Sequence, residues 1–443
     1  MASTSDPHQE SFRLGMLIYD TRYRSVTIQI IALIGFLTLI GWLIHNTAEN
    51  LSTLGKPISF SFLQSPAGYD INQTLLAYSS QSTHLRAAFI GLLNTLLIAV
   101  LGCATATVIG VTVGILRLSS NWLVARLMTI YVETFRNVPV LLWIVFTMAI
   151  LIESLPAPRD FRGDDASASM ILFDTVAITN RGVYIPEPRF SRSLGNVAVL
   201  PDNDDPVCMR VQGEGVETLP LNPACGIFQI SLDLVALLAA LAAGLFASGR
   251  IRKRADQVQA ATGTRPVTWY LRLGVVVLPV VALLVALGFH LSVPRLEGFN
   301  FRGGIYLRNS LISLWLALSL YTAAFIAEIT RAGILAIPRG QTEAAAALGL
   351  RPRRIMNLVI LPQALRVIIP PLISQYLNLT KNSSLAVAVG YMDLTGTLMG
   401  ITLNQTGREL ETVMLGMLFY LTISLLISAV MNWYNNRVRL VER

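Results

Sequence analysis

The chain of 443 residues is 53% hydrophobic and only 14% charged. Its mean hydropathy of +0.58 excludes an ordinary soluble domain, in which about a quarter of the residues are charged, and predicts a protein that crosses a membrane several times. The net charge of +8 would suit a nucleic-acid ligand. However, the basic residues lie in short connections between apolar runs, which is the orientation signal of a membrane protein.

Apolar runs long enough to cross a bilayer recur along the chain. A spanning helix needs roughly 20 residues, so these runs predict an all-α polytopic membrane protein with about eight transmembrane helices. The first run has no small-residue cleavage site after it and predicts a retained helix rather than a secretory signal. The runs cover residues 26–44, 87–116, 138–152, 228–247, 270–291, 305–329, 362–379 and 413–432.

Every second connection between these runs is basic, and so are both ends of the chain. Because basic connections stay in the cytoplasm, this pattern places both termini and the connection after residue 329 on the cytoplasmic side. The basic residues that set the orientation are Arg13, Arg22, Arg24, Arg117, Arg126, Arg250, Arg252, Lys253, Arg254, Arg331, Arg339, Arg351, Arg353, Arg354, Arg437, Arg439 and Arg443.

Two longer polar segments, residues 45–86 and 153–227, fall on the opposite side. The second is acidic, and its prolines and glycines predict turns or short strands over the membrane surface. A connection of this length is expected to be functional or an ordered cap. Cys208 and Cys225 both lie in it. Two interpretations stay open for them, a disulfide in an oxidising compartment or two free thiols.

Charged residues beside the spans are candidates for a transport path. Glu133 and Arg136 can pair on one helix face, and Pro139 disturbs the helix directly after them. Glu328 and Arg331 have the same spacing at the end of the sixth run. Such pairs either line a cavity or stabilise a helix end at the interface, and the sequence favours the second reading.

A polar segment interrupts the apolar stretch near the seventh run. Unwound polar backbone inside a span has to find partners, and in transporters it usually lines a cavity. The segment therefore predicts part of a translocation path or gate. It consists of Lys381, Asn382, Ser383 and Ser384.

A short alanine-rich helix and a second helix, residues 341–359, lie between the sixth and seventh runs. Thr342 is expected to cap the first helix, and Glu343 to lie in its first turn, near the positive end of the helix dipole. Gly349 permits a left-handed turn after it, and Pro352 opens the second helix. A polar helical hairpin outside the membrane, with a flat face of small side chains, predicts a docking site for a partner protein.

The sequence offers no sign of enzymatic chemistry. Lys56 precedes a proline where a nucleotide loop needs serine or threonine, and the four histidines have no metal-ligand spacing. The hairpin also has the pattern of a DNA-binding helix-turn-helix, but the flanking apolar runs tether it too closely to the membrane to enter a groove. A self-sufficient secondary transporter or channel stays as the alternative, although the coupling-ion residues and internal repeats it would need are not found.

The segment RAGILAIPRGQTEAA at residues 331–345, with Gly349 and Pro362, closely resembles the EAA loop of ABC-type importer permeases, in the form of the polar amino-acid uptake subfamily. Arg136 and Pro139 resemble the Arg-X-X-Pro of the same subfamily. Residues 328–331 and 381–385 match in kind, although Asn-Ser stands at 382–383 where Asp-Thr is commoner. The layout is similar to that of the larger, Q-type membrane subunit of general L-amino acid permeases.

The resemblance implies a type I importer permease core in two parts, residues 87–155 and 304–443. Residues 1–86 precede this core and add an N-terminal helix. Residues 156–303 interrupt it with an acidic periplasmic loop and two transmembrane helices.

The resemblance also implies a role in the uptake of L-amino acids across a bacterial inner membrane. The chain itself would bind no cofactor, since ATP and Mg²⁺ would bind a separate ATPase. The implied partners are a second permease subunit, a cytoplasmic ABC ATPase dimer, a periplasmic amino-acid-binding protein and membrane lipid, with no nucleic acid. Coupling to the ATPase falls to Gly340, Gln341, Glu343, Ala344, Ala345 and Gly349, and the translocation path or gate to Arg136, Pro139, Glu328, Lys381, Asn382, Ser383 and Ser384.

Overall fold

The computed structural model describes residues 18, 21–76, 78–162, 166–199 and 228–438. The chain divides into two compact units between Ser61 and Phe62. In the described part of the first unit, one long helix, α2 (Thr21–Thr53), carries exposed large apolar side chains along its length. Such a helix suits lipid on all sides.

The described residues contain eight helices that are long and apolar enough to cross a membrane, and each overlaps one of the eight predicted runs. Residues 228–231, 289–291 and 305–308, which the predicted runs included, form strands instead. The prediction of a polytopic helical protein is confirmed. The helices of the second unit are α3 (His84–Leu116), α4 (Trp122–Asn137), α5 (Val140–Ser154), α7 (Leu232–Thr262), α8 (Trp269–Ala286), α9 (Asn309–Leu335), α10 (Arg339–Ala347), α11 (Pro352–Ile355), α12 (Leu361–Asn382), α13 (Leu403–Thr406) and α14 (Glu409–Val438). Short 3-10 segments cover Ser61–Gln64, Pro158–Phe161 and Ser383–Val389 (η4), and π-helical segments cover Met356–Ile360 (η3) and Thr395–Thr402 (η5).

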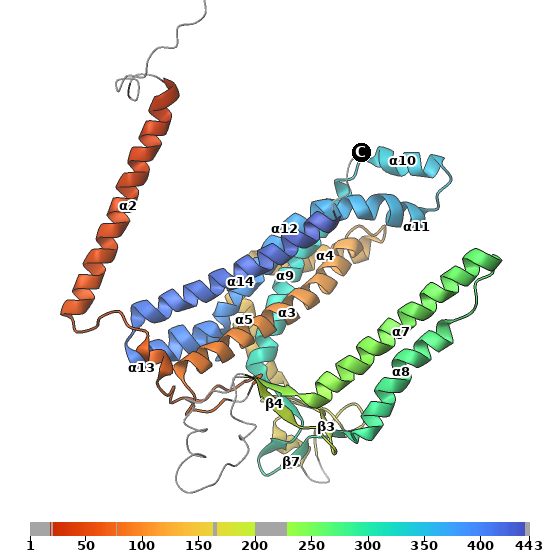
Figure 1. Cartoon of the computed structure of the whole chain (residues 1–443), viewed down its shortest axis with the longest axis horizontal. Coiled ribbons are helices and arrows are strands. Elements are labelled where there is room, and N and C mark those ends of the chain that lie inside the picture. Colours follow the sequence, from red (N-terminus) through yellow and green to blue (C-terminus); the bar gives the residue numbers. More distant parts are fainter. Residues whose placement is uncertain (1–17, 19–20, 77, 163–165, 200–227, 439–443) are drawn as a thin grey trace, which may run out of the picture. The chain divides into compact units, whose positions relative to one another are not determined.

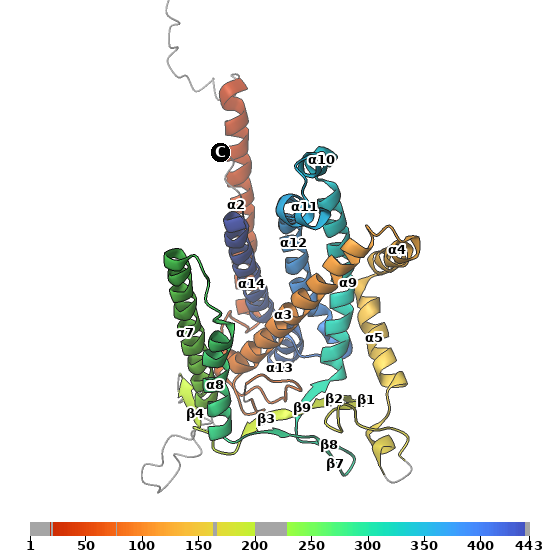
Figure 2. The ribbon, with the colours of Figure 1, turned by 90° about the vertical axis from the view of Figure 1, so that its right-hand side faces the viewer.

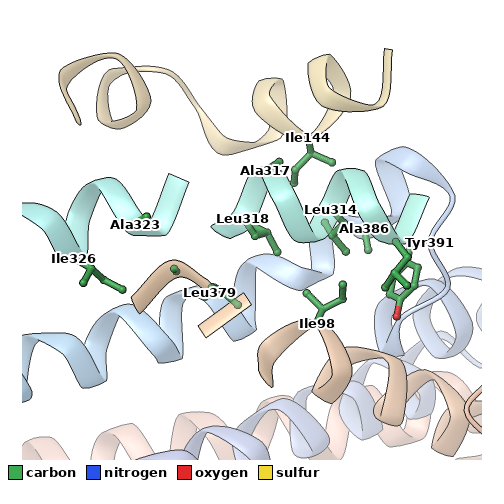
Figure 3. Packing of buried hydrophobic residues seen from close by; sticks show 12 residues of the cluster. Ile98, Ile144, Leu314, Ala317, Leu318, Ala323, Ile326, Leu379, Ala386 and Tyr391 are labelled. Carbon is green, nitrogen blue, oxygen red and sulfur yellow. The ribbon is translucent and has the colours of Figure 1, made fainter. Parts of the chain in front are cut away.

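Helix α9 forms the centre of the second unit and packs against α3, α4, α5 and α12. Ile144 of α5, Leu314 of α9 and Ile98 of α3 are fully buried in one cluster around it, and Figure 3 shows these side chains between the helices. Helices α3 and α12 bury part of their apolar side chains against α9, whereas α5, α7, α8 and α14 keep many of theirs exposed. Helix α9 is therefore the most buried of the described spanning helices, and α3 and α12 complete the core around it.

Small residues let α3 approach α9 closely. A Cβ built on Gly110 would lie 2.6 Å from the Cβ of Ile326, and one built on Gly114 would lie 2.7 Å from the carbonyl oxygen of Ala327. The spacing Gly110-x-x-x-Gly114 puts both glycines on one helix face. Small-residue contacts of this kind replace the hydrophobic drive that is missing between helices in lipid.

Short antiparallel strands gather at one end of the second unit, and α10 and α11 lie at the opposite end (Figures 1 and 2). The strands form a three-stranded sheet in the order β1-β2-β9 and three two-stranded sheets, β3-β6, β4-β5 and β7-β8. The structure thus contains the short strands expected of the second polar segment. The strands are β1 (Ala177–Thr179), β2 (Gly182–Ile185), β3 (Glu187–Phe190), β4 (Asn196–Val199), β5 (Phe228–Ser231), β6 (Phe289–Ser292), β7 (Arg295–Glu297), β8 (Asn300–Arg302) and β9 (Ile305–Arg308).

Helices α7 and α8 pack against each other as a hairpin that joins these strands. A Cβ on Gly244 would lie 2.8 Å from the carbonyl oxygen of Val275, so this pair also depends on a small residue at its contact. Strand β9 leads directly into α9. Because β9 pairs with β2, it connects the inserted strands to the central helix of the core.

Candidate functional site

Helices α10 and α11 and the turn between them are called here the coupling hairpin (residues 339–355). Helix α10 begins at Arg339 and has Pro338 at its N-cap, without a side-chain cap. The expectation that Thr342 caps this helix and that Glu343 lies in its first turn is wrong. A proline has no N–H to satisfy and its fixed φ suits a helix start, so the helix begins before the threonine is reached.

The coupling hairpin presents most of its α10 side chains to solvent. Gly340, Gln341, Glu343 and Ala344 are exposed, whereas Ala345 is buried on the side where α10 contacts α11 and η3. Just past the helix, Leu348 is 82% exposed. A large apolar side chain beside a row of alanines is unfavourable in water and gives a partner a surface to cover.

A left-handed residue ends α10, as predicted. Gly349 has φ +75°, and a Cβ added to it would meet nothing within 4 Å. Its amide donates to the carbonyl of Ala346 at 2.9 Å. Pro352 then occupies the first turn of α11. The sharp turn therefore depends on the backbone conformation of glycine and not on space around it.

A cluster of three charged residues lies at the end of α9 that leads to the coupling hairpin. Arg331 donates to Glu328 at 2.8 Å, which confirms the predicted pair. Arg117, which follows α3, donates to the other carboxylate oxygen of Glu328. The Arg117 side chain is only 8% exposed. Sequence spacing could not show this third member, because it comes from a distant helix.

The other predicted pair does not form. Glu133 and Arg136 are both exposed on α4, and the Arg136 guanidinium lies 5.4 Å from the ring centre of Phe325 on α9 instead. This cation–π contact joins α4 to the core. Pro139 separates α4 from α5, which begins at Val140.

The polar segment at residues 381–384 is helical and not unwound. Helix α12 continues to Asn382 and then tightens into the 3-10 helix η4, which ends at Gly390 with φ +68°. Ser383 is fully buried and its hydroxyl donates to the carbonyl of Thr380 at 2.8 Å. Lys381 is exposed and has no ion pair among the described residues. The segment changes the winding of the helix, and continued i→i+3 bonding supplies the partners that its backbone needs.

Sequence reasoning missed Asp393, which lies just before η5 and is the most buried acidic side chain of the described residues. It is fully buried. The Tyr420 hydroxyl donates to it at 3.0 Å, and the amide of Gly396 donates at 2.9 Å. An aspartate within an apolar stretch of a membrane protein is a functional candidate by its position alone, and this signal was present in the sequence.

Cys208 and Cys225 lie outside the described residues, so the proposed disulfide stays a prediction. In the part of the chain that the structure describes, no three His, Cys, Asp or Glu side chains are grouped so as to hold a metal ion.

A bundle of exposed apolar helices with a helical hairpin projecting from one end defines a multi-pass membrane protein. The chain belongs to the family of binding-protein-dependent transport system inner membrane components, whose pattern matches residues 106–440. This membership disfavours a self-sufficient secondary transporter.

Relatives of known name match the chain along its whole length. The glutamate/glutamine/aspartate/asparagine transport system permease protein BztB of Rhodobacter capsulatus is 56% identical over 451 residues, with 100% of both chains covered. The general L-amino acid transport system permease protein AapQ of Rhizobium johnstonii is 42% identical, covering 98% of this chain and 96% of its own. The putative amino-acid ABC transporter permease protein YhdX of Escherichia coli is also 42% identical, over 98% of this chain and 100% of its own.

Proposed function

We propose that this chain is a permease subunit of an ATP-driven importer of L-amino acids, with acidic amino acids and their amides among its substrates. The coupling hairpin carries the proposal, because an exposed small-residue helix with an apolar residue at its end needs a protein partner. The substrate class rests on the full-length likeness to relatives whose names specify amino acids.

The expected assembly has four kinds of component. The pair of glutamate/aspartate import permease proteins GltJ and GltK of Escherichia coli, both similar to part of this chain, supports a second permease subunit. A cytoplasmic ATPase dimer would bind ATP and Mg²⁺ and receive the coupling hairpin, and a periplasmic binding protein would deliver the substrate to the strand-rich end. Both termini would lie in the cytoplasm, as the placement of basic residues indicates.

Within this assembly the coupling hairpin transmits closure of the ATPase to α9. The ATPase would contact Gly340, Gln341, Glu343 and Ala344, while Gly349 would hold the angle between α10 and α11. The cluster at Glu328 would hold the inner ends of α3 and α9 together during this movement. Such a device biases a two-state equilibrium between outward and inward access.

The gate is assigned to the contacts around α4, α5 and η4. Arg136 would hold α4 against α9, and Pro139 would allow α4 and α5 to move separately. The change of winding from Asn382 through Ser383 and Ser384 would provide a flexible point in the path, with Lys381 on its exposed side.

Co-purification of this chain with a second permease, the ATPase and the binding protein in lipid nanodiscs tests the function. We expect ATP hydrolysis to rise when the binding protein carries glutamate or glutamine. Uptake into proteoliposomes should require ATP on the side of the membrane where the ATPase binds. Uptake that follows an ion gradient without the ATPase would contradict the proposal.

A further inference from the structure

An open pocket of about 400 Å³ lies where the β1-β2-β9 sheet meets α5 and the start of α9. Small-molecule sites have volumes of roughly 300–1,000 Å³, so this pocket can hold a free amino acid. The turn between β1 and β2 supplies lining residues from the inserted part of the chain, while β9, α5 and α9 belong to the core. The pocket therefore joins the two.

Two arginines provide the formal charge of the pocket lining in the described part of the chain. Arg181 comes from the turn before β2, and Arg308 ends β9. Among the described residues neither of them forms an ion pair: Arg308 donates Nε–H to the carbonyl of Asn72 at 3.1 Å, and Arg181 donates from Nη1 to the carbonyl of Phe299 at 3.3 Å. The remaining guanidinium N–H groups are suited to a carboxylate, for which arginine has a matching planar fork.

The nearby phenol of Tyr184 carries no negative charge that would offset the two arginines. Tyr184 on β2 is buried and stacks on Tyr306, a lining residue, with ring centres 4.5 Å apart. Burial raises the pKa of Tyr184 to about 12, so this side chain stays neutral at physiological pH. Among the residues that the structure describes, no acidic side chain lines the pocket.

The start of α9 adds partial positive charge to the same place. Arg308 occupies the N-cap without a side-chain cap, and Asn309 and Ser310, the first residues of α9, line the pocket. The amide of Asn309 donates to the carbonyl of Arg181 at 3.4 Å, and the positive end of the helix dipole still favours an anion beside this first turn. This contribution is secondary to the arginines.

Two asparagine side-chain oxygens supply hydrogen-bond acceptors beside the arginines. Asn309 is only 3% exposed; its Nδ2 donates to the carbonyl of Asn180 at 2.6 Å, while its Oδ1 accepts no hydrogen bond. Asn180 Oδ1 is buried without a partner as well. A buried acceptor without a donor is costly, and after a small side-chain shift that opens these oxygens to the pocket an ammonium group would satisfy them.

We propose that this pocket is an entry site for a free amino acid, and this proposal rests on the proposed function. Arg181 and Arg308 hold carboxylates, the oxygens of Asn180 and Asn309 accept from the α-ammonium group, and Met148, Ile152 and Val389 contact the aliphatic part of the ligand. Two positive charges without an acidic neighbour favour glutamate and aspartate over lysine and arginine. The chain thus selects substrate charge at its outer end.

The same pocket adjoins the polar segment of the seventh span. Val389 and Gly390, which line it, end the 3-10 helix η4 that begins at Ser383. A bound ligand therefore touches the end of the segment assigned to the gate. Occupancy can favour one winding of η4 only if the ligand binds the two states with different affinity.

The test uses the complete complex in nanodiscs without the binding protein, and measures the Kd of radiolabelled glutamate and its displacement by lysine. Arg181→Gln and Arg308→Gln are compared with Arg295→Gln, which removes an exposed arginine of β7 outside the pocket. Loss of one charged hydrogen bond at a partly exposed site predicts a Kd about tenfold higher. Arg308→Lys retains the charge and is expected to show a smaller loss, and basal ATP hydrolysis of each variant verifies assembly.

Each outcome has one meaning. Weaker glutamate binding in the two pocket variants, wild-type binding in the control and poor competition by lysine support the site. Equal Kd values in all variants, or no glutamate binding by the wild-type complex, overturn it. Unchanged glutamate binding with a weaker affinity for the binding protein makes this surface a docking site and also overturns it. Uptake by the wild-type complex with its binding protein is measured separately, so failure of the proposed function is distinguishable.

Discussion

Replacement of Gly349 by valine tests the coupling hairpin directly. The residue has φ +75°, and a Cβ there would meet no atom within 4 Å. The substitution therefore introduces no collision, and its cost is the left-handed conformation itself, about 1–2 kcal/mol for a residue with a Cβ and toward the upper end for a β-branched one. Since about 1.4 kcal/mol corresponds to a factor of 10, the native turn would lose roughly tenfold in population relative to alternatives.

Transport by Gly349→Val is expected to fall about tenfold, while insertion into the membrane stays normal because no spanning helix is touched. The assay is amino-acid uptake in proteoliposomes, together with stimulation of ATP hydrolysis by the liganded binding protein. Gly349→Asn should retain more activity, since asparagine tolerates this backbone conformation.

Gly263 provides a matched control. It follows α7 with φ +73° and also has no atom within 4 Å of an added Cβ, so Gly263→Val carries the same backbone strain away from the coupling hairpin. Uptake by this control should stay near the wild-type rate. Normal uptake by Gly349→Val, or an equal loss in both variants, would refute the reasoning.

Three further expectations follow from the packing and charge of the core. Glu328→Gln should lower the free energy of unfolding by about 2 kcal/mol, because Arg117 is left buried without a counter-charge. Unfolding in detergent checks this against Glu297→Gln, which removes an exposed pair with Arg302 at 3.8 Å and should change the free energy of unfolding by less than about 0.5 kcal/mol. Equal stability of the two variants would contradict the prediction. Gly110→Leu should abolish folded protein, since even a Cβ would lie 2.6 Å from Ile326. Gly249→Leu has open space around the added side chain and should express normally. Size-exclusion chromatography distinguishes folded from aggregated variants, and a folded Gly110→Leu would be contrary evidence. Tyr420→Phe should destabilise by about 1–3 kcal/mol because it removes a donor to buried Asp393, and an unchanged unfolding midpoint would show that water or another donor replaces the hydroxyl.

Local chemistry made much of the fold predictable from the sequence. Length and hydropathy suffice to find a spanning helix, because lipid requires each segment to satisfy its own backbone. The left-handed turn at Gly349 and the pair Glu328–Arg331 were also predictable, since both depend on residues close in sequence.

The remaining features depend on residues that are distant in sequence. Arg117 meets Glu328 only because α3 packs on α9, and Arg136 contacts Phe325 rather than Glu133 for a similar reason. Neither choice can be read from spacing along one helix. The start of α10 was misjudged for a local reason instead, because Pro338 competes with Thr342 as the place where a helix begins.

Helix α9 connects all the proposed functional elements of the second unit. Asn309 and Ser310 at its start line the outer pocket, and Glu328 near its end binds arginines from two places. The coupling hairpin follows within a few residues. Between these ends α9 is the most buried spanning helix, and a close-packed interior transmits displacement instead of absorbing it. If the proposed ATPase moves the coupling hairpin, the movement would therefore reach the pocket through one continuous helix, without a long chain of separate contacts.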